Sequence, residues 1–331
     1  MKIIILNYSS VFGGQERYAE SLINQLHTKN VLTSFEGGPE YLKKVSLDKL
    51  PCTDILNPSA RLFNGNAALY QSMTLTKGNE LWVYVQHSDI NDGQQASWKR
   101  WVRKALIYIL LKRFDLVIRV CNKALPDCYA KGKIKTIYNG VSVPECYKSV
   151  GIQKKIKLLM VGAINANKNQ KMAISVLQYL PNAELSIIGS GEIKQDLVEL
   201  AETIGVNSQI SWVGFVENLE PYYLNADLLL MLSHYEAFPY AVLEAMSYSV
   251  PVVTVRVGGV PEIISNNENG WLLDDYEIET LVDTLNEINN SPDSYKEVAQ
   301  AARATIEKNY TVKHMTNNLI AAIEEKLNVK R

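Results

Sequence analysis

The segment His234–Glu262 reads HYEAFPYAVLEAMSYSVPVVTVRVGGVPE and joins a predicted helix to a predicted strand. It contains two glutamates, Glu236 and Glu244, that lie eight positions apart. Between them, Pro239 suits the start of a helix, because the N–H that proline lacks would have no partner there. The apolar strand PVVTV and a Gly-Gly turn follow. A helix that leads directly into a buried strand is typical of a parallel α/β sheet.

The same alternation runs along the chain. Apolar runs predict strands at 2–6, 81–86, 115–120, 134–141, 157–163, 184–191, 210–215, 226–232 and 251–255. Helical patterns are predicted at 15–27, 169–180, 192–204 and 239–249. A polar, lysine-rich stretch at 142–155 has the composition of a linker. We therefore predict an α/β fold of two Rossmann-like, doubly wound domains, 1–145 and 155–311, that face a central ligand-binding cleft. A helix at about 312–328 could pack back onto the first domain.

The composition is that of an ordinary globular protein. The length of 331 residues is enough for two domains. Hydrophobic residues make up 47% of the chain and charged residues 21%. No apolar run reaches the roughly 18 residues of a membrane span, and the N-terminal MKIIILNYSS fits a buried first strand better than a signal peptide. The four cysteines lack metal-ligand spacing and suit reduced thiols. These features predict a cytoplasmic protein.

The net charge of -1 hides an asymmetry between the two halves. Residues 1–150 contain 20 Lys+Arg and 12 Asp+Glu, a net charge of +8, and the remaining residues contain 14 and 23, a net charge of -9. A positive half favours an anionic partner, which could be a nucleic acid, a phospholipid surface or a phosphorylated substrate.

The quoted segment has the chemistry to hold a sugar joined to a diphosphate. The first amides of the helix, at Tyr240, Ala241 and Val242, point out of its start, and a helix N-terminus is a ready anion site. A carboxylate near a bound phosphate is unfavourable unless it accepts hydrogen bonds from hydroxyl groups, which a sugar and a ribose supply. Glu236 and Glu244 fit that role.

This segment resembles the E-x7-E signature of retaining glycosyltransferases with two Rossmann-like domains, the GT-B fold of family 4. The resemblance covers nearly the whole chain and follows the family's order. Its motifs are Gly13-Gly14 after the first strand, His87 after a strand, Asn139-Gly140-Val141, Gly162 and Lys168 in VGAINANKN, Gly189 and Gly191 in GSG, Gly214-Phe215 in WVGFVEN, and Glu236 to Glu244.

The resemblance implies a role for each matching residue. Glu236 would hold hydroxyl groups of the donor sugar, Glu244 the ribose, and Lys168 the distal phosphate, where it stabilises the leaving group. Gly13, Gly14, Gly162 and Gly191 would border the donor, and Gly14 would let the backbone approach a phosphate. His87 would lie near the anomeric carbon. The base would be bordered by Gly214, Phe215 and Val216. The diphosphate and the sugar would be held by backbone amides in the segment of Phe238, Pro239, Tyr240 and Ala241.

The sequence departs from the family in three places. The family's second phosphate-binding cation, an arginine next to Gly162, is replaced by Ala163, and Arg17 is a candidate substitute. The usual Gly-Phe-Gly of the signature is Ala237-Phe238-Pro239, which could restrict the sugar pocket. The first domain is also shorter than is usual in the family, and this is the domain that carries the family's acceptor-binding elements.

The resemblance implies a retaining mechanism in which the leaving phosphate acts as the base for the incoming hydroxyl. No Asp-x-Asp motif occurs, so we expect neither a metal nor a cofactor, and positive charge would come from Lys168 and helix N-termini. The nucleotide sugar is a substrate, with UDP as the expected nucleotide.

A helix predicted at 95–113 bears on the acceptor. On a helical wheel its apolar residues fall on one face, and its basic residues fall on the other. A basic helix with tryptophans is typical of a membrane-surface element, and the alternative is a core helix with a solvated basic face. The first interpretation predicts a lipid-linked saccharide acceptor, bacterial surface polysaccharide synthesis, and docking on the inner face of the cell membrane. The expected contacts are Trp98, Lys99, Arg100, Trp101, Arg103 and Lys104.

Other classes remain open. A GT-B epimerase or phosphorylase would share the architecture, but an epimerase lacks this E-x7-E context and a phosphorylase needs a pyridoxal-phosphate lysine. A non-catalytic nucleotide-sugar-binding protein is consistent with Ala163. Nucleic-acid binding is disfavoured, because no aromatic stacking platform or helix-turn-helix pattern accompanies the basic half.

Overall fold

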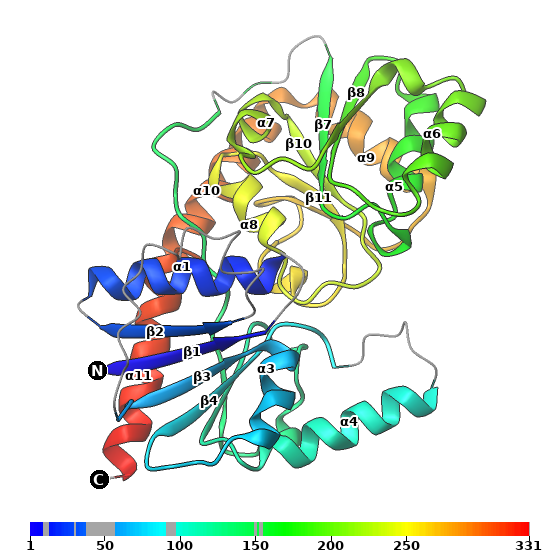
Figure 1. Ribbon diagram of the computed structural model, residues 1–331. Helices are drawn as coiled ribbons and strands as arrows, with labels where there is room; N and C mark the ends of the chain where they lie inside the picture. Colours follow the sequence, from blue (N-terminus) through cyan, green and yellow to red (C-terminus); the bar gives the residue numbers. More distant parts are fainter. Residues whose placement is uncertain are drawn as a thin grey trace. The chain divides into compact units, whose positions relative to one another are not determined.

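The computed structural model describes residues 1–8, 13–29, 31–37, 57–90, 97–148, 151 and 155–330. It divides into two compact units (Figure 1). Unit 1 comprises Met1–Gly140 and Tyr310–Arg331, and unit 2 comprises Val141–Asn309. The chain therefore leaves unit 1 once, forms all of unit 2, and returns to unit 1 through its C-terminal helix.

Unit 1 contains a six-stranded parallel sheet in the order β2-β1-β3-β4-β5-β6. Both faces of such a sheet are covered, so its strands are apolar along most of their length. In β1, for example, every residue after Lys2 is buried. The strands are β1 (Lys2–Asn7), β2 (Leu32–Gly37), β3 (Ala60–Asn64), β4 (Leu81–Gln86), β5 (Leu116–Arg119) and β6 (Ile134–Thr136).

Helices cover both faces of this sheet (Figure 1). The α1 helix packs against the C-terminal helix α11, α1 contacts β1 and β2, and α11 contacts β4. On the other side, α3 packs against β1, β3, β4 and the helix α4. Ile4 and Leu6 of β1 join the core on that side, which includes Phe63, Trp82 and Phe114. The helices are α1 (Gly14–Thr28), α3 (Gly65–Gln71), α4 (Ser97–Leu111) and α11 (Val312–Lys330), with 3-10 turns η2 (Ser72–Thr74) and η3 (Asp127–Tyr129).

Unit 2 contains a second six-stranded parallel sheet, in the order β12-β11-β10-β7-β8-β9. The strand order reverses between β7 and β10, which are neighbours in the sheet although β8 and β9 separate them in the chain. The strands are β7 (Ile156–Val161), β8 (Ala183–Ile188), β9 (Ile210–Gly214), β10 (Leu228–Met231), β11 (Val252–Val255) and β12 (Trp271–Leu273).

The helices of unit 2 connect and cover these strands. They are α5 (Gln170–Val176), α6 (Lys194–Thr203), α7 (Glu220–Asn225), α8 (Tyr240–Ser247), α9 (Ile278–Asn290) and α10 (Pro292–Asn309). Short 3-10 turns are η4 (Ala166–Lys168), η5 (Leu177–Tyr179), η6 (Asn207–Gln209) and η7 (Val260–Glu262). One continuous apolar cluster joins β7, β8, β10 and β11 to α5, α6 and α9.

The predicted α/β fold of two Rossmann-like units is confirmed, with three strands that the sequence did not indicate. β2 and β3 mix polar with apolar residues, and β12 has only three residues. The strand predicted at 134–141 ends at Thr136, and the helix predicted at 239–249 begins at Tyr240 with Pro239 as its N-cap. Within the described parts of the chain, no helix has both the length and the apolar character to cross a membrane.

Candidate functional site

The carboxyl ends of the unit 2 strands bring together loops that carry most of the predicted residues. In an open α/β sheet, ligands bind beyond these ends, where the strand order reverses. Here that point lies between β7 and β10. The loop after β7 carries Gly162 and Lys168, and the loop after β10 carries Glu236. Two residues that lie 68 positions apart in sequence therefore meet at one edge of the sheet.

Lys168 and Glu236 form an ion pair between these two loops. Both side chains are largely covered, with exposed fractions of 25% and 14%. The backbone supports the pair, because Asn167 holds the second loop. Its carbonyl accepts from the His234 N–H at 2.8 Å, and its side chain bonds both the N–H and the carbonyl of Tyr235, at 2.9 and 3.1 Å. The loop geometry thus sets the cation and the carboxylate in place.

Two glycines allow backbone segments to approach closely at this edge. Gly189 has a φ of +140°, and a Cβ there would lie 1.8 Å from the Gly162 carbonyl oxygen. Gly258 has a φ of +50°, and a Cβ there would lie 1.6 Å from the Glu236 carbonyl oxygen. Gly191 packs likewise against the backbone of Ile164. Larger residues at these positions would displace the loops that carry Lys168 and Glu236.

The start of α8 follows directly after Glu236. Pro239 is the N-cap, with extended backbone angles, and no side chain caps the helix start. The first amides of a helix have no acceptor within the helix, so this end has the donors and the dipole that favour an anion. Phe238 and Tyr240 are buried, and Ala241 is partly buried. The segment is therefore held by packing while its amides define the anion-binding end.

Glu244 lies one turn into α8 and is also fixed. Its Oε2 accepts a hydrogen bond from the Tyr223 hydroxyl at 2.9 Å. The Tyr223 ring stacks on Tyr248, with ring centroids 5.3 Å apart and planes 17° apart. No local sequence pattern singles out Tyr223 or Asn167, because each contacts a residue far away in the chain.

The end of β9 presents an exposed aromatic ring. Gly214 has a φ of +83°, and its carbonyl accepts from the Gly189 N–H at 2.8 Å, so this strand end is tied to the loop after β8. Phe215 is 68% exposed, and Val216 is partly exposed. An exposed aromatic face is a suitable platform for stacking a nucleotide base.

The predicted residues Gly13, Gly14 and Arg17 lie at the start of α1 in unit 1. Gly13 is the N-cap of α1, and its N–H donates to Glu16 Oε2 at 2.8 Å. Gly14 is exposed. One amide of the glycine turn is therefore already occupied, and a carboxylate lies at the helix start. Arg17, the suggested substitute cation, is partly exposed one turn further along α1.

His87 directly follows β4. Its Nε2 lies 2.6 Å from Asn64 Oδ1, and its ring meets the Tyr18 ring edge-on, with centroids 4.8 Å apart. Burial of the imidazole lowers the pKa of His87 from 6.5 to about 3. The ring is therefore neutral at physiological pH.

The exposure of α4 residues excludes one of the two interpretations of this helix, that of a core helix. Trp98 and Trp101 are 66% and 71% exposed, so α4 is not a core helix with a solvated basic face. The buried face consists of Ile107, Leu110 and Leu111. The basic residues Arg100, Arg103 and Lys104 are partly covered instead, and Arg103 Nη2 donates to the Ile90 carbonyl at 3.0 Å.

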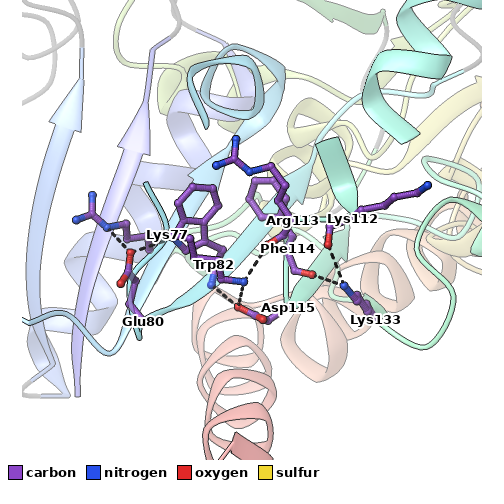
Figure 2. A network of polar contacts seen from close by, with 9 residues as sticks. Lys77, Glu80, Trp82, Lys112, Arg113, Phe114, Asp115 and Lys133 are labelled. Carbon is purple, nitrogen blue, oxygen red and sulfur yellow. Dashed lines mark hydrogen bonds and ion pairs between the residues drawn. The ribbon is translucent and has the colours of Figure 1, made fainter. Parts of the chain in front are cut away.

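A network of polar contacts fixes the C-terminal end of α4 (Figure 2). Lys77 Nζ pairs with Asp115 Oδ2 at 2.8 Å and donates to the Arg113 carbonyl at 2.9 Å. Lys133 Nζ donates to the Phe114 carbonyl at 2.7 Å. Asp115 Oδ2 also accepts from the Trp82 N–H at 2.9 Å. These contacts hold the turn that follows α4 and so anchor that end of the helix.

A comparison with known protein families bears on unit 2. Residues 145–305 match the family model described as glycosyl transferases group 1. Unit 2 is therefore similar to a group 1 glycosyltransferase domain. The match covers the loops of the Lys168–Glu236 pair, α8 and Phe215, so the candidate site lies within the segment that the family shares.

Individual relatives extend this likeness. An uncharacterized glycosyltransferase of Haemophilus influenzae is 24% identical over 272 residues, which cover 80% of this chain and 73% of that protein. The amylovoran biosynthesis glycosyltransferase AmsK of Erwinia amylovora is 27% identical over 188 residues, 53% of this chain and 46% of that protein. The chain thus spans less than half the length of AmsK.

A solved structure shows the shared fold of both units. The structure of HepE from Anabaena in complex with UDP superposes with a TM-score of 0.78 at 19% identity, covering 98% of this chain and 100% of that one. The two-domain GT-B architecture is therefore that of this chain.

Proposed function

We propose that this protein is a retaining, metal-independent glycosyltransferase of family 4 that moves a sugar from a nucleoside diphosphate to a hydroxyl of a saccharide acceptor. The observation that carries the proposal is the Lys168–Glu236 ion pair. It lies in the loop that leads into the start of α8, and the tyrosine-held Glu244 lies about one turn into that helix. This arrangement combines a cation, a helix N-terminus and two carboxylates at a strand-order switch point.

Each of these groups has a task in donor binding. Lys168 leaves its ion pair with Glu236 and binds the distal phosphate instead. The first amides of α8 bind the other phosphate oxygens. Glu236 then accepts hydrogen bonds from the sugar hydroxyls, while Glu244 accepts from the ribose. Phe215 stacks against the base. The HepE structure holds UDP, which supports UDP as the nucleotide here.

The chemistry requires charge stabilisation rather than a protein nucleophile. The acceptor oxygen forms a bond to the anomeric carbon while the bond from that carbon to the phosphate oxygen breaks. The acceptor proton passes to the departing phosphate on the same face of the sugar. Lys168 and the α8 amides stabilise the negative charge that develops on the diphosphate.

A panel of nucleotide sugars tests this function. We expect one donor to bind and to be hydrolysed slowly without an acceptor, and both Glu236→Ala and Lys168→Ala to abolish that hydrolysis. Lys171→Ala, which removes an exposed lysine of α5, is the matched control. Tight binding without turnover, even with lipid-linked saccharides, would favour a non-catalytic nucleotide-sugar-binding protein. The replacement of the family's arginine by Ala163 favours that second candidate.

We also propose that the outward face of α4 docks on an anionic lipid surface, where the enzyme extends a lipid-linked saccharide for bacterial surface polysaccharide. Trp98, Trp101 and Ile109 are 59 to 71% exposed on one helix. Exposed Lys99 and Lys112 flank them, and α4 contains no acidic residue. Apolar side chains with flanking lysines favour an anionic interface. AmsK, named for amylovoran biosynthesis, supports the pathway class.

Liposome flotation tests the docking surface. We expect binding to vesicles containing phosphatidylglycerol but not to neutral vesicles, and loss of binding in a Trp98→Ser/Trp101→Ser double variant. Tyr179→Ser, at an exposed aromatic of unit 2, is the control. Equal binding to both vesicle types, or no effect of the double substitution, would contradict a docking role for α4.

A further inference from the structure

Three carboxamide side chains in unit 1 form a relay that ends at His87. They are Gln15, Asn7 and Asn64, which we call the carboxamide relay. Asn7 ends β1, Asn64 ends β3, and Gln15 lies in the first turn of α1. Parallel strands present their carboxyl ends at one edge of the sheet, so these polar residues gather beside His87, which follows the neighbouring strand β4.

Two backbone carbonyls fix how the amides of the relay are oriented. Gln15 Nε2 donates to the Asn64 carbonyl at 2.8 Å, and Asn64 Nδ2 donates to the Gln15 carbonyl at 2.9 Å. A carbonyl oxygen only accepts hydrogen bonds, so the amide nitrogens must face it. Both amide groups also donate to Asn7 Oδ1, at 2.6 and 3.3 Å. Reversing any amide group of the relay would place two hydrogen-bond donors or two acceptors opposite each other.

The orientation of Asn64 determines the tautomer of His87. Because Asn64 Nδ2 is used for Gln15 and Asn7, its Oδ1 faces the imidazole and lies 2.6 Å from His87 Nε2. An oxygen acceptor at this distance requires a proton on Nε2. In a neutral ring, Nδ1 then carries only a lone pair. His87 is partly exposed, and no described residue bonds to Nδ1.

The packing around the relay leaves little freedom. Asn7 and Asn64 have no exposed surface. Gly65 has a φ of +78°, and a Cβ there would lie 2.0 Å from Gln15 Oε1, so the Gln15 side chain occupies the space above this glycine. The backbone on the far side of His87 is held as well, because Gln86 Nε2 donates to the Ser88 carbonyl at 2.6 Å.

We infer that Gln15, Asn7 and Asn64 are positioning residues that hold His87 as the neutral Nε2–H tautomer, so that Nδ1 accepts a hydrogen bond from a hydroxyl group of a saccharide bound at this edge of the unit 1 sheet. This inference rests on the proposed function, in which the enzyme binds saccharide substrates. It assigns the role of a hydrogen-bond acceptor to Nδ1 of His87. The relay also links His87 to α1, whose start carries Gly13 and Gly14.

The tautomer can be measured directly, without any activity. The chain has four histidines, so long-range 1H–15N correlation spectra of protein labelled with 15N-histidine give few signals, and His87→Gln assigns the one of interest. We expect His87 to show protonated Nε2 and unprotonated Nδ1 between about pH 6 and 8. A wild-type signal with the proton on Nδ1, or a ring that is cationic at pH 6, would overturn the inference.

Variants test the relay itself. Asn64→Ala removes the acceptor and should give a mixture of both tautomers, and Gln15→Ala should produce a smaller change in the same direction. Gln25→Ala, at an exposed contact on the same helix, is the control. Unchanged His87 signals in both relay variants would contradict a positioning role. If a variant does not fold, the wild-type tautomer still decides the inference.

Kinetics separate this inference from the proposed function. Kinetics are measured with a donor that the wild-type protein turns over. Gln15→Ala should lower kcat about 3- to 10-fold, which is the typical effect of one hydrogen bond, while the KM for the donor changes little. Failure of every nucleotide sugar to bind or react would reject the proposed function, and the spectra alone would then decide the tautomer. Normal turnover with the proton on Nδ1 would reject the relay and leave the proposed function intact.

Discussion

At the scale of single residues, the proposed function depends on the ion pair between Lys168 and Glu236. The carboxylate of Glu236 neutralises the Lys168 cation. A diphosphate carries more negative charge than one carboxylate and can replace it. Glu236 is then released at the place where a sugar joined to that diphosphate would present its hydroxyl groups.

This exchange predicts opposite effects for the two partners. Lys168→Ala should weaken binding of UDP alone, because it removes the phosphate cation. Glu236→Gln should preserve or strengthen binding of UDP, since Lys168 no longer has a competing carboxylate, yet it should slow turnover about 100-fold. Calorimetric titration with UDP and with the sugar nucleotide checks both. Equal weakening of UDP binding in the two variants would contradict the exchange.

The lowered pKa of His87 predicts how the stability of the protein changes with pH. Its pKa is lowered by burial to about 3 from 6.5, so below pH 6.5 the unfolded chain binds a proton that the folded chain does not. Its contribution is therefore present above pH 6.5 and is lost as the pH falls toward 3. His87→Gln should reduce the slope of stability against pH in that window, as measured by urea unfolding. His27→Gln, at the exposed end of α1, is the control, and equal slopes would contradict the buried neutral ring.

At the scale of the elements, α4 has one buried face and one exposed apolar face. Ile107 and Leu111 are almost fully buried, whereas Trp98 and Trp101 lie mostly in solvent. Periodicity alone places apolar residues on a face but does not say which face meets the core. Here Arg100, Arg103 and Lys104 are partly covered, whereas the tryptophans follow the exposed side.

The two faces of α4 should respond differently to substitution. Leu111→Ala removes a buried side chain and should destabilise unit 1 by about 2 to 5 kcal/mol. The Trp98→Ser/Trp101→Ser double variant should change the unfolding free energy by less than about 1 kcal/mol, because exposed positions contribute little. Urea unfolding measures both. Strong destabilisation by the double variant would show that the tryptophans pack within the protein.

The elements also show what a sequence can predict. Strands with continuous apolar runs, such as β1 and β4, were predicted, and so was the helix start between Glu236 and Glu244. β2 and β3 were missed because burial in a parallel sheet does not require an uninterrupted apolar run. Contacts between distant residues, such as Tyr223 with Glu244, leave no local pattern. A polar residue at the carboxyl end of a buried strand, as at Asn64, is the signal that could have pointed to the relay.

At the scale of the whole molecule, the chain closes unit 1 with its last helix. Leu319 and Ile323 of α11 are fully buried, and α11 packs on α1 and β4. Unit 1 is therefore complete only after unit 2 has been synthesised.

This arrangement predicts that a destabilising substitution in α11 lowers the stability of unit 1. Ile323→Ala should destabilise unit 1 by about 2 to 5 kcal/mol, although the substituted residue follows unit 2 in the chain. Hydrogen exchange resolved by peptide should show faster exchange in β1 and β4, with β7 and β10 unchanged. Glu324→Ala, the neighbouring exposed position, is the control. Faster exchange confined to unit 2 would contradict the assignment of α11.

We propose that this molecule transfers a sugar from a nucleotide with retention of configuration. The sharpest test is 1H NMR of an α-linked donor during its slow hydrolysis by the protein, which identifies the anomer that is released first. We expect the α anomer to appear before mutarotation in the wild-type protein and not in Lys168→Ala. Initial release of the β anomer, or no hydrolysis of any nucleotide sugar in the presence or absence of saccharide acceptors, would contradict it.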